Sequence, residues 1–200
     1  WSWSRGLGDV YKRQILMNLI NLNSREYDVI IVGAGFSGLY QLICLRDQLS
    51  MNCLVVETGD DVGGTWYWNR YPGARCDTES HAYSYYFSDE LLKEWTWSER
   101  YPGHAEIRRY MNFVADKFDL KKDILFNHKV TSAQYNEDKV CWKITTNNKI
   151  NLRSKFLITA VGCLSNANIP KIKGLENFKG KYYHTGCLLY TSPSPRDQLQ

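Results

Sequence analysis

The sequence lacks several features that mark other classes of protein. No apolar run reaches the ~18 residues of a membrane-spanning helix. The stretch at residues 15–22 is too short, and too interrupted by asparagine, for a secretory signal. The cysteines are scattered, with neither a CxxC pair nor a His/Cys pair at metal-ligand spacing. These absences argue against a disulfide framework and a metal site, and they predict a cytoplasmic protein with no membrane partner.

Strong charge of either sign is also missing. The formal net charge is +4, and four basic and two acidic residues in the terminal segments account for half of it. The remainder is weak and dispersed along the chain. We therefore expect no nucleic-acid partner.

The two termini resemble one DNA sequence read from opposite strands. Residues 4–14 can be encoded by a string whose reverse complement, shifted by one base, encodes residues 187–196. This resembles a translated transposon-type sequencing adapter at each end of a library insert. We predict that residues 1–14 and 187–200 are non-native and exclude them from fold reasoning. The informative chain is then 15–186. It has a plausible start at Met17, and we expect the natural protein to continue beyond Gly186.

A glycine turn between two apolar strands organises the chain. The run Asp28–Val32 is short and β-branched, as in a buried parallel strand, and Gly33–Gly38 follows at once. A second apolar run, Cys53–Glu57, ends in an acid. The stretch between them has the apolar spacing of a helix, with Leu39, Leu42, Ile43, Leu45 and Leu49 on its stripe. The pattern predicts a strand–turn–helix–strand unit with a dinucleotide fingerprint.

Each glycine of this turn has its own physical role. Gly33 permits the tight turn, Gly35 lets a pyrophosphate approach the backbone, and Gly38 lets the helix pack close to the sheet. Glu57 lies 19 residues after Gly38 and can accept hydrogen bonds from ribose hydroxyls. Because a carboxylate there repels a 2′-phosphate, FAD or NAD is favoured over NADP. The alternative is a glycine-rich turn of an unrelated α/β protein.

Residues 58–77 form a long stretch rich in glycine and aromatic residues, which we expect to be irregular. Such loops in compact domains are usually functional. Aromatic walls with a few polar groups suit a planar ring with a polar edge. A packed satellite core and a stacking surface for nucleic acid are the alternatives.

The rest of the chain predicts a helical turn near Ser88 and an amphipathic helix over 105–118. The charged residues off its apolar stripe, which include Arg108 and Arg109, are expected to face solvent. Short strands follow over 124–126, 129–135, 140–145 and 150–153. We interpret them as a β-meander, followed by a core strand over 156–160.

The segment after the second strand resembles a known family. Its Gly63-Gly64-Thr65-Trp66, its Tyr71-Pro72-Gly73 and its Asp77 resemble the signature of Baeyer–Villiger monooxygenases. Neighbouring segments at 77–80, 97–101 and 113–120 are similar to the same family, so the likeness covers essentially the whole of 15–186. The fold class it implies is α/β, with an incomplete Rossmann-like FAD-binding domain made of a parallel sheet, helices and a β-meander.

The resemblance implies a function and assigns residues to it. Enzymes of this family use FAD, NADPH and O₂ to convert a ketone to an ester or lactone. By matching position, the pyrophosphate of FAD would contact Gly33, Gly35, Ser37 and Gly38, its ribose Glu57, and its adenine region Val130. The flavin half would contact Gly64, Thr65, Trp66, Trp68 and Tyr83. The nicotinamide side would face Arg75, Cys76 and Asp77, and the resemblance makes Asp77 the catalytic candidate, because in the family it tunes an active-site arginine.

That arginine and an NADP-binding domain are not found in the 200 residues, so we expect the chain by itself to be inactive. Two alternatives stay open. One is another two-dinucleotide flavoenzyme, either an N- or S-oxygenating monooxygenase or a disulfide reductase, although a reductase requires a CxxxxC motif that this sequence lacks. The other is a nucleotide-binding fragment without activity.

Overall fold

The structure is a computed structural model that describes residues 25–166 and 168–184. The segments predicted to be non-native, 1–14 and 187–200, lie outside these residues, and so does Met17. Contacts divide the chain into two compact units. The first contains the described residues up to Asp61 together with Asp119–Ala160, and the second contains Val62–Phe118 and the described residues from Val161 on. Each unit is described by itself.

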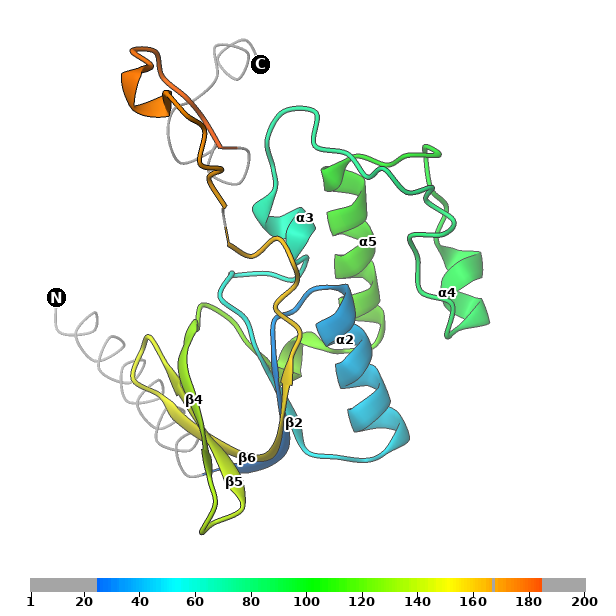
Figure 1. Ribbon diagram of the computed structural model, residues 1–200. Helices are drawn as coiled ribbons and strands as arrows, with labels where there is room; N and C mark the ends of the chain where they lie inside the picture. Colours follow the sequence, from blue (N-terminus) through cyan, green and yellow to red (C-terminus); the bar gives the residue numbers. More distant parts are fainter. Residues whose placement is uncertain (1–24, 167, 185–200) are drawn as a thin grey trace, which may run out of the picture. The chain divides into compact units, whose positions relative to one another are not determined.

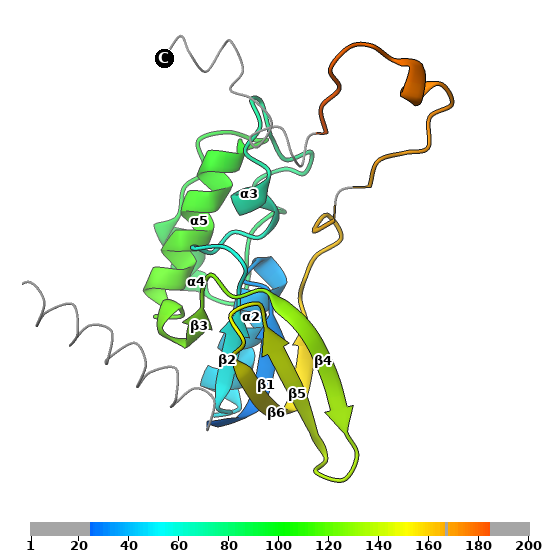
Figure 2. The ribbon, with the colours of Figure 1, turned by 90° about the vertical axis from the view of Figure 1, so that its left-hand side faces the viewer.

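A six-stranded mixed sheet forms the first unit, in the order β3-β2-β1-β6-β5-β4 (Figures 1 and 2). Its strands are β1 (Glu26–Val32), β2 (Cys53–Val56), β3 (Ile124–Leu125), β4 (Val130–Asn136), β5 (Cys141–Thr146) and β6 (Asn151–Thr159). Strands β3, β2, β1 and β6 run parallel, and β5 and β4 continue the sheet in antiparallel pairing. The predicted α/β class with a β-meander is confirmed.

Strand β1 is the buried centre of the parallel part. Val29, Ile30 and Ile31 are at most 1% exposed, and all four residues of β2 are buried. Val29 lies beside Cys53 on one side and beside Phe156 on the other. Burial on both faces explains why the strand is continuously apolar rather than alternating.

Helix α2 (Phe36–Ile43) follows the glycine turn and packs against β1 and β2; in Figure 1 it lies to the right of β2 and β6, while β4 and β5 continue the sheet to the left. Leu39 and Leu42 are fully buried, as the helical spacing predicts. The α-helix ends at Ile43, and one π-helical turn, Cys44–Gln48, continues it. The wider turn breaks the 3.6-residue period. The expectation that Leu49 belongs to the buried stripe is wrong, because this side chain is 64% exposed.

The strands of the second half differ from the prediction in two respects. Ile124–Leu125 pairs in parallel with β2, so it belongs to the central sheet and not to the meander. The two runs predicted at 150–153 and 156–160 form one strand, β6. Its beginning pairs with β5 and most of its length pairs with β1. One strand therefore joins the meander to the parallel sheet.

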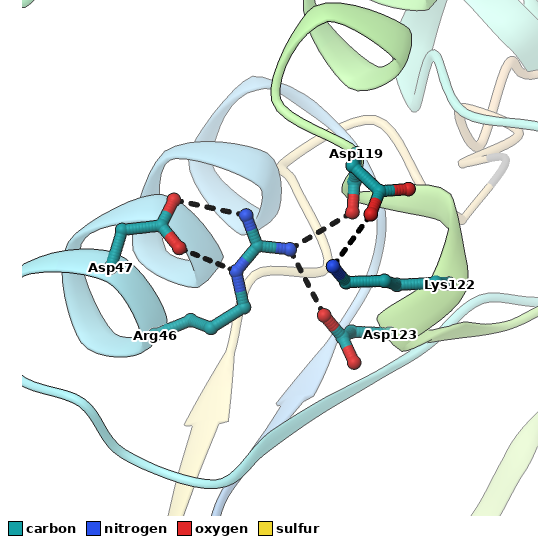
Figure 3. A network of polar contacts seen from close by, with 5 residues as sticks. All are labelled: Arg46, Asp47, Asp119, Lys122 and Asp123. Carbon is teal, nitrogen blue, oxygen red and sulfur yellow. Dashed lines mark hydrogen bonds and ion pairs between the residues drawn. The ribbon is translucent and has the colours of Figure 1, made fainter.

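A polar network connects the π-helical turn to the chain before β3 (Figure 3). The Arg46 guanidinium donates to both carboxylate oxygens of Asp47, at 2.6 and 2.9 Å, and to the Asp119 carbonyl at 3.0 Å. It also donates to the Asp123 carboxylate at 2.9 Å, and Lys122 bonds Asp119 at the edge of the network. These acceptors raise the pKa of Arg46, with Asp47 contributing most. The network therefore joins the π-helical turn to residues 119–123, which are more than 70 residues away in sequence.

Helices and loops make up the second unit. Its helices are α3 (Thr65–Trp68), α4 (Asp89–Glu94) and α5 (His104–Lys117), with a 3₁₀ turn at Leu175–Asn177. The Ser88 hydroxyl caps α4 by accepting from the Leu91 N–H at 3.2 Å, which confirms the helical turn predicted there. Helix α5 matches the predicted amphipathic helix and buries Ile107, Tyr110 and Met111. Within the described residues, no helix is long and apolar enough to cross a bilayer.

Candidate functional site

The glycine turn at the end of β1 has the geometry of a close strand-to-helix passage. Gly33 has φ +106°, a conformation that favours glycine, and its N–H donates to the Val56 carbonyl at 2.9 Å. A Cβ at Gly38 would lie 1.8 Å from the Gly33 carbonyl oxygen, so no side chain fits there. Gly35 is different, because its φ of −86° is open to any residue. A need for glycine at position 35 therefore comes from a ligand that approaches this backbone, and not from the backbone conformation itself.

Helix α2 begins just after Gly35, and within the described chain it has no capping side chain and no acidic residue in its first turn. The first N–H groups of a helix have no intrahelical acceptor, and the helix dipole adds positive potential there. Ser37 lies on this turn and is exposed. The arrangement suits an anion such as a pyrophosphate.

Glu57 directly follows β2 and is buried, with 5% exposure. One carboxylate oxygen accepts from the Ala34 N–H in the glycine turn, and the other accepts from the Gly59 N–H, each at 2.7 Å. The carboxylate therefore fixes the glycine turn, a role that spacing alone did not indicate. A carboxylate offers about four lone-pair positions, so acceptor capacity remains for ribose hydroxyls. That contact stays a prediction, as does the adenine contact of Val130, which begins β4 and packs partly buried against the sheet core.

In the second unit, two glycines introduce the short helix α3. Gly63 and Gly64 have φ of +139° and +52°, and a Cβ on Gly63 would lie 2.9 Å from the Cβ of Tyr67. The expectation of a wholly irregular segment over 58–77 is wrong at this point, because the glycines permit one helical turn, Thr65–Trp68. A turn of this length presents successive aromatic side chains in different directions.

The aromatic side chains of this segment divide into buried and exposed ones. Trp66 is 7% exposed, and its indole N–H donates to the Tyr83 hydroxyl at 3.0 Å. The two rings meet edge to face, with centroids 5.9 Å apart. Burial raises the pKa of Tyr83, so the phenol stays protonated. Trp68 is 37% exposed, which leaves part of its ring available to a ligand.

The segment with Asp77 is held against the chain that precedes α5. The Cys76 N–H donates to the Pro102 carbonyl at 3.1 Å, and the Ser80 N–H donates to the Arg100 carbonyl at 2.7 Å. The Arg75 guanidinium bonds Glu99 and the Tyr101 carbonyl.

Within this frame Cys76 is buried and Asp77 is exposed. The contact between the Asp77 carboxylate and the Thr78 hydroxyl is a long one, at 3.5 Å. An exposed carboxylate on a braced loop is suited to orienting a cation.

A cluster around Tyr67 was not expected from the sequence. Arg108 was predicted to be solvated, but its guanidinium carbon lies 5.0 Å from the Tyr67 ring centroid, so that prediction is wrong. Arg70 approaches the same ring at 5.1 Å. Arg109 is exposed, as predicted. The sequence pattern that could have indicated this cluster is the spacing of His104 and Arg108, which lie one helical turn apart.

The β1–turn–α2–β2 unit, with its glycine turn and terminal acid, defines the dinucleotide-binding class of α/β folds. Comparison with known proteins gives the family. Residues 26–194 match the family described as flavin-binding monooxygenase-like. The chain belongs to this family.

Individual relatives are more specific. The chain is 44% identical over 175 residues to a Baeyer–Villiger monooxygenase of Pseudooceanicola batsensis, covering 86% of this chain and 32% of the relative. It is 46% identical over 160 residues to cyclohexanone 1,2-monooxygenase of Acinetobacter sp., covering 80% and 30%. A solved structure of oxidised steroid monooxygenase bound to NADP is 48% identical with a TM-score of 0.72, covering 81% of this chain and 31% of that one.

These relatives confirm the resemblance to Baeyer–Villiger monooxygenases and the FAD-domain fold class. The chain spans about a third of the length of the curated relatives it matches. A relative with other chemistry also matches: phenazine N-monooxygenase of Lysobacter antibioticus is 39% identical over 169 residues, 84% of this chain and 31% of the relative.

Proposed function

We propose that this chain is the FAD-binding part of an NADPH- and O₂-dependent monooxygenase that converts small ketones to esters or lactones. The observation that carries the proposal is the combination of two segments in one chain. One is the dinucleotide-type turn Gly33–Gly38, and the other is the braced Gly64–Asp77 segment. The chain's relatives include enzymes named for Baeyer–Villiger chemistry.

The residues of the first unit fit the ADP half of FAD. The turn excludes a side chain at Gly38, and the first turn of α2 offers backbone donors without an acidic residue of its own. In the proposal, the pyrophosphate contacts Gly33, Gly35, Ser37 and Gly38. Glu57 accepts from the ribose through its remaining lone pairs, and Val130 borders the adenine.

The residues of the second unit supply the flavin side. In the proposal, the flavin half contacts Gly64, Thr65, Trp66, Trp68 and Tyr83. Tyr83 accepts from the Trp66 indole and so fixes the orientation of that ring. When bound, FAD supplies the redox chemistry that links NADPH and O₂ to the substrate.

Asp77 is the residue of this chain that we propose as the catalytic candidate. In the proposal, Arg75, Cys76 and Asp77 face the nicotinamide of NADPH. Its exposed carboxylate would hold the orientation and charge of an arginine contributed by a longer parent protein. Because the chain spans about a third of its relatives' length and we assign that arginine to none of its residues, we propose that the chain alone binds FAD without turnover. The proposed partners are a small-molecule ketone and O₂, with no nucleic acid or membrane. The proposed compartment is the cytoplasm, supported by five unpaired cysteines among the described residues.

A pair of glycine variants tests the FAD site. Gly35 and Gly103 both cap a helix with negative φ, −86° and −74°, so alanine strains neither backbone. We expect Gly35→Ala to lower the FAD-to-protein ratio after gel filtration, because its methyl group occupies the pyrophosphate approach. Gly103→Ala should retain FAD, since its Cβ would meet nothing closer than 3.8 Å. Equal retention by both variants would contradict the assigned site, and NADPH oxidation with cyclohexanone by the 200-residue chain would contradict the proposed lack of turnover.

N-oxygenation is the second candidate function, because the phenazine N-monooxygenase also matches most of this chain. The two chemistries give different products. A longer gene product containing this segment, assayed with cyclohexanone and with phenazine, should form the lactone. Formation of the N-oxide with no lactone would favour the second candidate.

A further inference from the structure

Four side chains of the second unit form what we call the Tyr67 cluster: Tyr67, Arg70, His104 and Arg108. Tyr67 lies on α3 and Arg70 shortly after it, while His104 begins α5 and Arg108 lies one turn further on. The guanidinium carbons of Arg70 and Arg108 lie 5.1 and 5.0 Å from the Tyr67 ring centroid. The two fixed positive charges are therefore no further apart than the sum of these distances.

Two polar atoms of the cluster are buried without a hydrogen-bond partner among the described residues. They are Nε of Arg70 and Nδ1 of His104. The Tyr67 ring attracts the guanidinium through its π-face, but it does not accept a directional bond from the N–H at Nε. Buried polar groups in folded proteins nearly always have a partner, so this pair indicates an acceptor that the described residues do not supply.

The environment of His104 is electropositive. Burial lowers the pKa of His104, and Arg70 and Arg108 lower it further. Two acidic residues, one in the first turn of α5 and one shortly before the helix, have other partners. Glu106 accepts from the backbone N–H and hydroxyl of Ser98, each at 2.8 Å, and Glu99 bonds Arg75. The orphaned atoms of Arg70 and His104 therefore lie in a positive field, which favours an anion as their missing acceptor.

We propose that the Tyr67 cluster binds a phosphate dianion, either as inorganic phosphate or as a phosphate monoester. Near pH 7 such a group carries about −1.5 to −2 charges and three or more acceptor oxygens. One oxygen can accept from Nε of Arg70 and another from Nδ1 of His104, while Arg108 adds positive potential. A carboxylate carries a single charge, so the same field holds it less strongly. Guanidinium groups also form short, strong bonds to phosphate oxygens. This site uses none of the residues assigned above to FAD or to nicotinamide.

The histidine resonances of the 200-residue chain provide a direct test. The chain has four histidines, so each imidazole signal can be followed by NMR. At constant pH and ionic strength, titration with inorganic phosphate should shift the His104 signal saturably. The signals of His81, His128 and His184 should not saturate with it. A parallel titration with AMP identifies the source: saturation by both ligands shows that a monoester fits, and saturation by inorganic phosphate alone shows a site for the free ion. A His104 signal that does not saturate, or that responds equally to sodium acetate, overturns the proposal.

Charge-neutral variants locate the binding groups. Arg70→Gln should weaken phosphate binding by about tenfold or more, because it removes a charge-assisted hydrogen bond from a buried site. Arg109→Gln is the matched control, since Arg109 is the exposed neighbour of Arg108 on the same helix. It should change the dissociation constant by less than about twofold, as an exposed charge does. Equal affinities of Arg70→Gln and Arg109→Gln overturn the assignment, and the wild-type titration decides the matter should Arg70→Gln fail to fold.

Discussion

The passage of Gly38 past Gly33 allows a quantitative prediction. Alanine at Gly38 places a Cβ 1.8 Å from the Gly33 carbonyl oxygen and 3.0 Å from its carbonyl carbon. Both contacts are backbone atoms, which cannot rotate away. The start of α2 and the end of β1 must therefore separate by roughly 1 Å, and overpacking of this kind costs about 1–3 kcal/mol, occasionally more. The Cβ of Ala160, at 3.6 Å, adds only an ordinary van der Waals contact to this estimate.

An opposing effect has to be subtracted. Alanine is favoured over glycine inside a helix by about 1 kcal/mol. A contact as short as 1.8 Å places the overpacking cost at about 3 kcal/mol, the top of the range given above. After the helix preference of alanine is subtracted, we expect Gly38→Ala to lower the free energy of unfolding by about 2 kcal/mol. In a domain of this size, that corresponds to a fall in Tm of about 4–8 °C.

Urea unfolding followed by circular dichroism measures this difference. Ser37→Ala is the control, because it changes the neighbouring residue of the same helical turn without adding an atom at the crossing. It should be neutral or slightly stabilising. A Gly38→Ala chain as stable as the Ser37→Ala chain would refute the close crossing of β1 and α2.

Three further predictions concern other parts of the chain. Arg46→Gln should lower the free energy of unfolding by about 1 kcal/mol, because the guanidinium is mostly buried in the network. Lys122→Gln, at the exposed edge of the same network, should lower it by less than about 0.5 kcal/mol. Equal losses in urea unfolding would contradict the central role of Arg46. Iodoacetamide at pH 8, followed by mass spectrometry, should label exposed Cys163 well before Cys53, because burial raises the pKa of the Cys53 thiol to about 11; the reverse order would count against this packing. NMR titration should give His104 a pKa below 6.5, since burial and two guanidiniums disfavour its charged form. As pH falls from 6.5 towards that lowered value, the unfolded chain binds a proton that the folded chain does not, so His104 reduces stability in this window; a pKa at or above 6.5 would contradict the burial.

Local patterns predicted the elements whose causes are local. The β-branched run before Gly33 and the apolar run before Glu57 became the buried strands β1 and β2. The stripe on α5 predicted the burial of Ile107 and Tyr110. Each of these patterns follows from burial of one face or both faces of a regular element.

Features that depend on distant partners could not be read in this way. The pairing of Ile124–Leu125 with β2 depends on a strand nearly 70 residues earlier. The place of Arg108 over Tyr67 depends on how α3 meets α5, which no local pattern encodes. The same holds for Glu57, whose bond to the Ala34 N–H crosses 23 residues.

The position of β6 has a consequence for synthesis on the ribosome. Strand β1 can pair with β2 soon after both are made. Its other neighbour is β6, so the second partner of Val29, Phe156, is synthesised more than 120 residues later. Until Phe156–Thr159 leaves the exit tunnel, one edge of the apolar β1 stays unpaired. Exposed strand edges invite intermolecular pairing, and long-range parallel pairing forms slowly. The nascent chain is therefore vulnerable to aggregation over this interval, and chaperone dependence should be greatest when synthesis stalls while Phe156–Thr159 is still inside the exit tunnel.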